Sequence, residues 1–475
     1  MIQGKDPREK SIIQTVYEVG QGHLFRWWDE LDERSKNQLL EQLEQIDFSL
    51  LNRLRDRCFD QARNGLLKQN LEPPEIIPIP KTETQMKTAE EAKQIGETFV
   101  QSGKLGIVVV AGGQGTRLGY DGPKGCYPIS PVKKKSLFQM HAEKILAESR
   151  AYGVTIPWYI LTSESNEETT KLFFKQNRYF GLSSENVFFM KQQMLPALDE
   201  TGKCILDRKD HVFTSPDGHG GVLLAMVESG ALEDMERRGV ELLSYFQVDN
   251  PLICIVDPVF IGYHIRKKAE MSSKMVRKKD PMEKVGHFIM ADGKLKVIEY
   301  SDMSKEELQL QSPDGTLKFG AGSIGIHLIN RDFVGQEAKK EPGLPFHVAH
   351  KKIPFLDDTG FSVDPEKPNG YKFEMFVFDA LQETTQSVIM EVIRENEFSP
   401  LKNLTGNGSP ESVQRDISNY FGNWLESAGV TIPMDKQKNV LGKIEISPLF
   451  ARNREEWLNK FPSKIKFEDS FYLGP

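Results

Sequence analysis

The sequence of 475 residues is poor in cysteine: it has four, and no two of them form a C-x-x-C pair. Such a wide scatter disfavours a disulfide framework and a structural zinc site. Long apolar runs are also missing, because none approaches the ~20 residues that a membrane-spanning helix requires. The polar segment 1–10 lacks the apolar centre of a signal peptide. We therefore expect a cytoplasmic protein that uses no membrane.

An excess of positive charge is absent as well. Lys and Arg number 61 against 68 Asp and Glu, which gives a net charge of −7. A general attraction to nucleic acid is thereby disfavoured, although a local basic pocket is compatible with this balance. The three lysines at 133–135 are predicted to form a solvated loop rather than a nucleic-acid patch.

The chain begins with a helical region. Within residues 1–100, apolar side chains recur at helical spacing, and Ser35 with Gln38 predicts a capping box at the start of one helix. The Pro-rich stretch 72–80 cannot be helical, and we expect a linker or an extended strap there.

From about residue 100 the pattern becomes an alternation of strands and helices. The β-branched run at 107–110 predicts a strand that is buried on both faces, as in a parallel sheet. Further strands are predicted at 157–162, 187–189, 242–248, 285–290, 295–300, 323–329 and 388–394, and helices after the cap Ser136 and at 222–238, 373–381 and 411–427. This order is typical of an α/β doubly wound sheet, with an antiparallel or mixed addition over 285–330.

A glycine-rich loop follows the first buried strand. It reads Ala-Gly-Gly-Gln-Gly-Thr-Arg-Leu-Gly over 111–119 and continues to Gly-Pro-Lys-Gly at 122–125. Ligands of open α/β sheets bind at the carboxyl ends of strands, and glycines let the backbone approach them closely. Arg117 and Lys124 add two cations. The segment therefore predicts a cradle for a polyphosphate.

Two common phosphate-binding signatures are absent from this loop. A dinucleotide fingerprint needs a third glycine where the sequence has Leu118, and no G-x-x-x-x-G-K-[ST] string occurs. Neither a dehydrogenase nor a P-loop nucleotidase is supported by its own signature.

A carboxylate follows another predicted strand. Asp249 ends the run 242–248, where it can bind Mg²⁺ beside nucleotide phosphates; a turn or cap before Asn250 is the alternative. Asp257, which precedes Pro258, is expected to cap a helix.

The loop over 112–119, with Pro-Lys-Gly at 123–125, resembles the signature of sugar nucleotidyltransferases. It is most similar to that of the eukaryotic-type UDP-N-acetylglucosamine pyrophosphorylases, within the UDP-sugar pyrophosphorylase (UDPGP) group. Further landmarks follow in family order at 194–197, 216–221, 248–250, 299–301, 321–322 and 397–403. The tail past 410 is less similar.

The resemblance implies a fold and a division of the chain. The fold would be a central Rossmann-like, GT-A-like α/β nucleotidyltransferase domain over 101–395. A helical N-terminal region and strap would occupy 1–100, and a small C-terminal domain would occupy 396–475. The resemblance also implies a monomer or weak homodimer.

The implied reaction joins UTP and N-acetylglucosamine 1-phosphate, with Mg²⁺ as cofactor, into UDP-N-acetylglucosamine and pyrophosphate. The sugar phosphate attacks the α-phosphorus directly, so no activated Ser, Cys or His is needed. By the same resemblance, the catalytic groups are Arg117, Lys124 and Lys402; the nucleotide is bound by Ala111, Gly112, Gly113, Gly115, Thr116, Gln192, Gly218 and His219; the sugar is bound by His219, Gly286, Glu299 and Ser323; and the metal is bound by Asp249. Gln193 is the alternative to Gln192 for reading uracil.

Two residues depart from the acetylglucosamine pattern. His219 and Ser323 stand where those enzymes usually have Asn, and Gly-His-Gly is familiar from UDP-glucose and broad-specificity UDP-sugar pyrophosphorylases. A UDP-glucose or broad UDP-sugar pyrophosphorylase is therefore the alternative within the class. A catalytically inactive protein that binds uridine nucleotides is the alternative from another class, although such a protein would be expected to lose one of the cations or Asp249.

Overall fold

A computed structural model of the chain describes residues 2–61, 70–340, 343–461, 467 and 469–475. By its internal contacts the chain divides into two compact units. Unit 1 consists of Met1–Gln69, Gln192–Gly221 and Leu344–Val377, and unit 2 consists of Asn70–Lys191, Val222–Gly343 and Phe378–Pro475. This division differs from the three consecutive segments predicted above. The N-terminal helices share a core with two later segments, and the helix of the tail shares a core with the main sheet.

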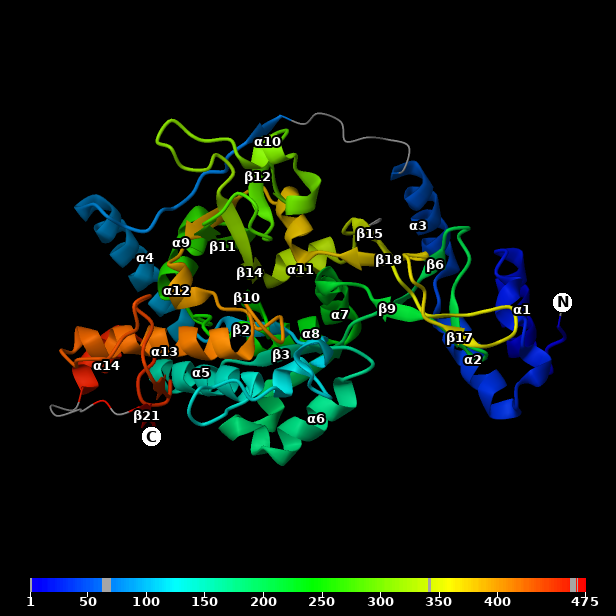
Figure 1. The fold of residues 1–475 in the computed structure, drawn as a ribbon, viewed down its shortest axis with the longest axis horizontal. Coiled ribbons are helices and arrows are strands. Elements are labelled where there is room, and N and C mark those ends of the chain that lie inside the picture. The colour runs from blue at the N-terminus through cyan, green and yellow to red at the C-terminus, as the bar shows by residue number, and fades with distance from the viewer. Residues whose placement is uncertain (1, 62–69, 341–342, 462–466, 468) are drawn as a thin grey trace. The chain divides into compact units, whose positions relative to one another are not determined.

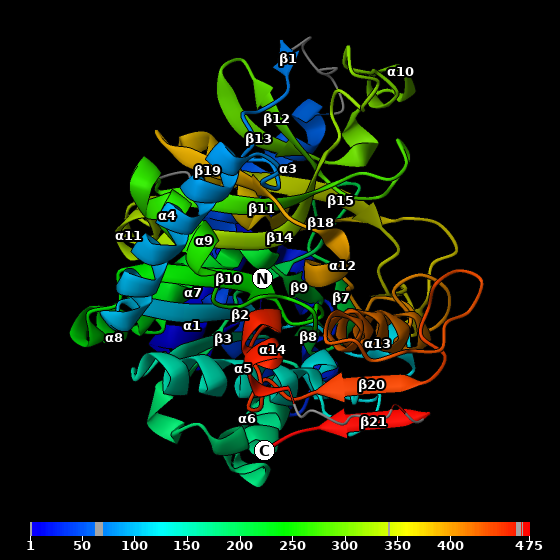
Figure 2. The same ribbon diagram turned by 90° about the vertical axis from the view of Figure 1, so that its left-hand side faces the viewer.

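Unit 2 is built on a large mixed sheet, as predicted. Among the described residues it has 10 strands, and the main path runs β1-β12-β14-β10-β2-β3-β4, with β11 beside β14, β19 beside β11 and β13 beside β12. Their bounds are β1 (Leu71–Glu72), β2 (Leu105–Val110), β3 (Trp158–Thr162), β4 (Val187–Lys191), β10 (Leu242–Gln247), β11 (Met271–Arg277), β12 (His287–Ala291), β13 (Lys294–Ile298), β14 (Ala321–Asn330) and β19 (Ser387–Glu391). Figure 2 shows β19, β11, β14, β10, β2 and β3 one below the other.

Strand direction in this sheet changes at β14. Strands β10, β2, β3 and β4 are mutually parallel, whereas β14 is antiparallel to β10 and to β11. The β-branched residues Ile107, Val108 and Val109 are all fully buried, because helices cover both faces of β2. The carboxyl ends of the parallel strands therefore share one edge, which carries the glycine-rich loop and Asp249.

Helices lie on both sides of the sheet. Figure 1 shows α4 and α9 on one side and α7, α8 and α11 on the other. The helices of unit 2 are α4 (Glu83–Gln101), α5 (Leu137–Tyr152), α6 (Glu167–Gln176), α7 (Val222–Glu228), α8 (Ala231–Arg238), α9 (Pro258–Lys267), α10 (Lys305–Leu308), α11 (Arg331–Glu337), α12 (Arg394–Glu397), α13 (Pro410–Ser427) and α14 (Arg454–Lys460). The side-chain oxygens of Ser136 and Asp257 cap α5 and α9, as predicted. The Pro-rich stretch is an extended strap, because Ile77 exchanges backbone hydrogen bonds with Ile389 and Glu391 of β19.

The described part of unit 1 combines α-helices with small antiparallel sheets. Its helices are α1 (Pro7–Glu18), α2 (Glu33–Gln45) and α3 (Phe48–Gln61). Its strands are β5 (Met194–Pro196), β6 (Leu198–Asp199), β7 (Leu206–Arg208), β8 (His211–Val212), β9 (Thr214–Pro216), β15 (Phe346–Lys351), β16 (Phe355–Leu356), β17 (Ser362–Val363) and β18 (Gly370–Met375). One core joins them, in which Leu39 and Leu43 of α2 pack with Leu195, Val212 and Phe373.

Three local predictions are wrong. Ser35 does not begin a helix, because the Asp32 side chain caps α2 by accepting from the Ser35 backbone N–H at 2.8 Å. The expected helix 222–238 is split into α7 and α8 around Gly230, whose φ of 77° lies in the left-handed region. Residues 373–381 form the end of β18 and a 3-10 helix, Val377–Glu383, rather than an α-helix.

The prediction for the three lysines is wrong at one position. Lys133 and Lys134 are exposed, but Lys135 is buried, with its Nζ 2.6 Å from Glu143 Oε2 and 3.6 Å from Glu445 Oε1. Glu445 lies on β20 (Lys443–Ile446), which pairs with β21 (Ser470–Leu473). The C-terminal strands thus help to bury a lysine that the sequence alone predicts to be solvated. Among the helices of the described residues, none has the length and apolar character needed to cross a bilayer.

Candidate active site

Two polar side chains from the segment after β3 hold the glycine-rich loop by hydrogen bonds to its backbone. Asn166 Nδ2 donates to the carbonyl oxygen of Ala111 at 2.9 Å, and Ser163 Oγ donates to that of Gly112 at 2.8 Å. Both side chains come from a buried residue. Neither residue is among those predicted from the sequence, although polar residues directly after a buried strand are a recognisable signal in an α/β sheet.

The glycines of this loop serve different purposes. A Cβ placed on Gly113 would meet nothing within 4 Å, so the backbone is open to a ligand there. A Cβ on Gly115 would lie 2.8 Å from the Tyr120 ring, so packing requires this glycine. The Gly113 carbonyl accepts from the Lys124 backbone N–H at 3.0 Å. This bond places Lys124 beside the open part of the loop.

The predicted catalytic arginine lies at the surface of the loop. Thr116 and Arg117 belong to a 3-10 turn, Thr116–Leu118, and both are exposed. Leu118 is buried and anchors the turn in the core. The turn ends at Gly119, whose φ of 65° lies in the left-handed region. Arg117 is thus carried on an anchored turn, with its guanidinium on the solvent side.

Lys124 and Asp249 come together across the edge of the sheet. Lys124 Nζ lies 2.9 Å from Asp249 Oδ2, and the two side chains are only 18% and 10% exposed. Asp249 is in the loop that follows β10, the parallel neighbour of β2. A charge-assisted hydrogen bond in a partly dry site is stronger than the same bond in water. The pair therefore sets one cation and one carboxylate in fixed positions.

The segment that carries Lys402 is hydrogen-bonded to the Asp249 loop. The Leu401 backbone N–H donates to the Asp249 carbonyl at 2.9 Å. The Lys402 backbone N–H donates to the Gly408 carbonyl at 2.7 Å, and the Lys402 side chain is exposed. Lys124, Asp249 and Lys402, far apart in the sequence, are thus gathered at one edge of unit 2.

Three predicted sugar-binding residues also lie together. The Ser323 backbone N–H donates to the Gly286 carbonyl at 2.8 Å. A Cβ on Gly286 would lie 3.4 Å from Glu299 Oε1 and 2.7 Å from Val297 Cγ1, so only glycine fits there. Ser323 is near the start of β14, whose pairing with β10 runs antiparallel. The start of β14 therefore lies at the same edge as Asp249.

The predicted uracil-reading residues belong to unit 1. Gln192 is buried and Gln193 is half-buried, just before β5. The Gln193 carbonyl accepts from the Asp217 backbone N–H at 3.1 Å, and the Asp217 carbonyl accepts from the Met375 backbone N–H at 2.7 Å. The choice between the two amides stays a prediction.

His219 lies in the same unit, in a 3-10 turn, His219–Gly221. Its Nδ1 accepts from the Val377 backbone N–H at 3.2 Å, which leaves the proton of the neutral imidazole on Nε2. The ring stacks on Phe376, with 5.2 Å between the ring centroids. His219 is therefore fixed in orientation by the protein.

The packing of unit 1 requires the glycines on both sides of His219. They are predicted to let a ligand touch the backbone. Gly218 has a φ of 86°, and a Cβ on it would collide with the backbone of Met375; a Cβ on Gly220 would lie 2.7 Å from the Met375 carbonyl carbon. Close packing against the end of β18 thus explains both glycines without a ligand.

The chemistry of the donor set fits one Mg²⁺ ion. Within the described residues, no group of three or more His, Cys, Asp or Glu side chains could hold a metal by itself. Asp249 is a single carboxylate beside the glycine-rich loop. Mg²⁺ is commonly bound by one or two carboxylates together with phosphate and water oxygens. An ion held by Asp249 and by substrate phosphates is consistent with this arrangement.

The chain matches the UDPGP family, described as UTP–glucose-1-phosphate uridylyltransferase, over residues 52–407. It is 38% identical over 470 residues to the UDP-N-acetylglucosamine pyrophosphorylase of Saccharomyces cerevisiae, which covers 95% of this chain and 97% of that protein. It is 37% identical over 440 residues to the UDP-N-acetylhexosamine pyrophosphorylase-like protein 1 of Homo sapiens, which covers 89% of this chain and 86% of that protein.

A solved structure agrees with these sequences. The uridine diphosphate N-acetylglucosamine pyrophosphorylase of Trypanosoma brucei, in complex with an inhibitor, has a TM-score of 0.83 and is 26% identical, covering 100% of this chain and 99% of that one. With the glycine-rich loop and the charged edge of the sheet in place, the chain belongs to the UDPGP family, together with the eukaryotic-type UDP-N-acetylglucosamine pyrophosphorylases.

Proposed function

We propose that this protein is a uridylyltransferase that forms UDP-N-acetylglucosamine and pyrophosphate from UTP and N-acetylglucosamine 1-phosphate. One observation carries the proposal: Lys124, Asp249 and the Lys402 segment meet beside an open glycine of the loop that follows β2. The yeast relative, similar over nearly its whole length, is a UDP-N-acetylglucosamine pyrophosphorylase by name. That name supports the choice of sugar.

The reaction requires positioning and charge neutralisation more than an activated side chain. A phosphate oxygen of the sugar 1-phosphate forms a bond to the α-phosphorus of UTP. The bond between this phosphorus and the oxygen bridging to the β-phosphate breaks, and its electron pair leaves with pyrophosphate. The nucleophile is already an anion at neutral pH, so no general base is needed. Cations placed around the α-phosphate lower the barrier by stabilising the charge that develops there.

Each cation has a separate task in this proposal. Lys124, held between the glycine-rich loop and Asp249, would neutralise charge at the α-phosphate. Arg117, on the exposed turn, would fork the leaving β- and γ-phosphate oxygens, which suits a planar guanidinium. Lys402 would bind the phosphate of the sugar. The open backbone at Gly113 would let the nucleotide lie against the loop.

Mg²⁺ is the proposed cofactor, with Asp249 as its protein ligand. When bound, the ion would supply positive charge to the phosphate oxygens and fix their orientation. Asp249 would share its carboxylate between this ion and Lys124.

The residues proposed to bind the sugar also support a second candidate function. Glu299 beside Gly286 can accept hydrogen bonds from sugar hydroxyls, and Ser323 adjoins Gly286. Because Ser323 and His219 replace the amides expected for acetylated sugars, a UDP-glucose or broad UDP-sugar pyrophosphorylase is the alternative.

The deciding experiment measures pyrophosphate release with UTP and Mg²⁺ against four sugars: N-acetylglucosamine, N-acetylgalactosamine, glucose and galactose 1-phosphates. Release mainly with the acetylated sugars is expected. Release mainly with glucose 1-phosphate would replace the proposal by its alternative. UTP binding without release with any sugar would indicate a non-catalytic nucleotide-binding protein.

Assembly and compartment are proposals as well. We infer a monomer or weak homodimer in the cytoplasm. The three cysteines with described side chains, Cys126, Cys204 and Cys254, are free thiols, which fits a reducing compartment. Sedimentation at micromolar concentration would test the assembly state.

A further inference from the structure

One strand of the main sheet, β11, carries a completely buried lysine. Lys274 of β11 has a side-chain exposure of 0%, and its Nζ lies 2.7 Å from Asp257 Oδ2 and 2.6 Å from Glu397 Oε1. Burial opposes the charge on this ammonium, but the two carboxylates outweigh it and raise the pKa of Lys274 above its ordinary value. A cation is therefore kept in the interior.

Each carboxylate of this triad also holds a piece of backbone. Asp257 Oδ1 accepts from the first turn of α9, at 3.0 Å from the Val259 N–H and 3.2 Å from the Phe260 N–H. Glu397 Oε2 accepts from the Cys254 backbone N–H at 3.1 Å. Lys274 thus joins three elements: β11, the start of α9 and the residue at which α12 ends.

Glu397 begins the segment that leads to Lys402, which we term the 397–402 segment. Asn250 joins this segment to the Asp249 loop, because its Nδ2 donates to the Glu397 carbonyl at 2.6 Å and its Oδ1 accepts from the Ser399 N–H at 3.1 Å. The bond from the Leu401 N–H to the Asp249 carbonyl extends the same pairing. Hydrogen bonds therefore join the two loops at successive positions, starting at Glu397, the ion-pair partner of Lys274.

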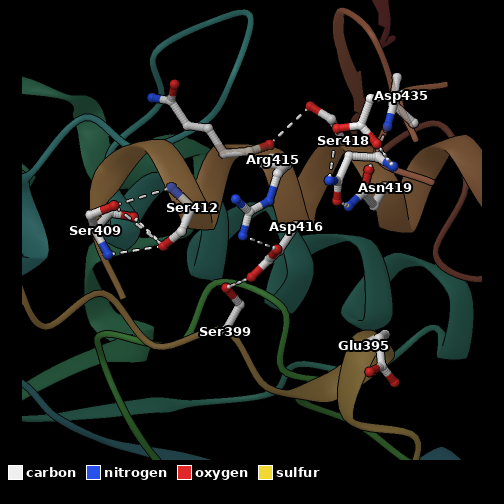
Figure 3. A network of polar contacts seen from close by, with 12 residues as sticks. Glu395, Ser399, Ser409, Ser412, Arg415, Asp416, Ser418, Asn419 and Asp435 are labelled. Atoms are coloured by element: carbon white, nitrogen blue, oxygen red, sulfur yellow. Dashed lines mark hydrogen bonds and ion pairs between the residues drawn. The ribbon is translucent and has the colours of Figure 1, made fainter. Parts of the chain in front are cut away.

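The other side of the 397–402 segment is fastened to α13. Ser399 Oγ donates to Asp416 Oδ2 at 2.7 Å, and Figure 3 shows the two side chains pointing toward each other, with Arg415 close by. Ser409 caps α13 with its side chain. Lys402, between Ser399 and this cap, lies on a short stretch of chain whose two ends are fixed.

The energetics of the triad favour a positioning role over a stabilising one. Removing a cation and two carboxylates from water carries a large free-energy cost, and well-packed apolar residues often stabilise such a place as well or better. Ion groups of this kind can instead select one arrangement of the backbone. Here the arrangement selected is that of the segment bearing a predicted phosphate-binding lysine.

We propose that Lys274 is a positioning residue for the reaction: through Glu397 it fixes the 397–402 segment, and with it Lys402, against the Asp249 loop. This inference rests on the proposed function. It predicts that loss of the Lys274 charge misplaces the sugar-phosphate cation while the nucleotide side, built on the loop after β2, stays intact.

The test compares Lys274→Met with Lys135→Met. Lys135 is a matched control, since it too is a buried lysine between two carboxylates in unit 2. The measurements are KM for the sugar 1-phosphate and kcat from pyrophosphate release, Kd for UTP from calorimetry, and Tm. We expect Lys274→Met to raise this KM by about tenfold and to lower kcat, because misplacement of a binding group by ~1 Å can cost up to about a hundredfold. The Kd for UTP should stay within about twofold, and Lys135→Met should lower Tm without changing KM.

Two further variants, Glu397→Gln and Lys402→Ala, keep the test decisive if Lys274→Met does not fold. Glu397→Gln retains the shape and one acceptor of the side chain but removes the charge that pairs with Lys274. It should raise the KM for the sugar 1-phosphate in a protein that remains folded. In a Lys402→Ala background, either substitution should add nothing further to KM, because both act through Lys402.

The outcomes separate the two proposals. An active Lys274→Met protein with unchanged KM and kcat would overturn the positioning role alone, and so would an equal rise of KM in Lys135→Met. An additive effect in the Lys402→Ala background would also overturn it. Absence of pyrophosphate release from the wild-type protein would overturn the proposed function and the positioning role with it.

Discussion

Lys124 and Asp249, separated by 125 positions in the sequence, form an ion pair with 2.9 Å between Nζ and Oδ2. The two residues follow neighbouring parallel strands, so the sheet itself brings them together. Each side chain is oriented by the other before a substrate arrives. Such preorganisation lowers the cost of ordering charged groups during catalysis. The proposals for Lys402 and Lys274 extend outward from this pair.

Arg117→Ala should reduce turnover by on the order of a hundredfold or more, because a cation on the leaving phosphates is lost. The side chain is exposed, so the variant should remain folded with an unchanged Tm. Steady-state pyrophosphate release and a thermal melt measure both effects. Arg150→Ala, another exposed arginine at the end of α5, is the control and should be neutral. Near-normal turnover in Arg117→Ala would remove this residue from the mechanism.

Asp249→Asn should lower kcat by on the order of a hundredfold and raise the Mg²⁺ concentration needed for half-maximal rate. The substitution removes the proposed metal ligand and leaves Lys124 without its counter-charge. Initial rates over a Mg²⁺ titration show both effects. Asp332→Asn, at an exposed aspartate of α11, serves as the control. An unchanged Mg²⁺ requirement would contradict the assignment of the metal to Asp249.

Ser323→Asn should change the ranking of sugar 1-phosphates more than the Kd for UTP. The residue adjoins Gly286, which itself faces Glu299, whereas the glycine-rich loop proposed to bind UTP follows β2. An amide offers donors and an acceptor with a longer reach than a hydroxyl. Competition assays with mixed sugar 1-phosphates provide the ranking. The same ranking before and after the substitution would show that Ser323 does not select the sugar.

Two glycines of the same loop should respond in opposite ways to alanine. Gly113→Ala meets open space, so Tm should be kept while UTP affinity falls by about tenfold. Gly125→Ala would drive a Cβ into the Phe138 ring and should destabilise the fold by about 1–3 kcal/mol. Calorimetry with UTP and thermal melts distinguish the two cases. Full UTP affinity in Gly113→Ala would mean that the nucleotide does not lie against this backbone.

His141→Gln should reduce the acid sensitivity of folding. Burial lowers the pKa of His141 to about 3, while the unfolded chain has the ordinary value of 6.5. Between these values the unfolded state binds the extra proton, so stability is full above pH 6.5 and falls as the pH drops. The contribution is about 1.4 kcal/mol per pH unit for one group. His141 Nε2 lies 2.9 Å from the Val248 carbonyl oxygen, and a glutamine amide can still donate to it. Urea unfolding at pH 4–6.5 should show a smaller slope of stability against pH in His141→Gln. Equal slopes would show that His141 does not titrate on unfolding.

Local pattern determined much of the fold. The β-branched run at 107–110 is a buried strand, and Ser136 and Asp257 cap helices, because these features depend on neighbouring residues alone. Competition between neighbours explains a miss: Asp32 and Ser35 could each begin a helix, and the earlier residue does so. Gly230 likewise divides a helical pattern that its neighbours favour. A single sequence does not rank such alternatives.

The sequence by itself determined the glycine-rich loop, the strand that carries it and the family signature, because the loop residues lie next to one another in the chain. Only the tertiary structure decided that Lys135 and Lys274 are buried and that Asn250 joins two loops. Burial of a charge depends on partners such as Glu445 and Glu397, which come from segments more than a hundred residues away. A long-range partner leaves no periodicity in the local sequence, so these contacts become visible only when the sheet has assembled.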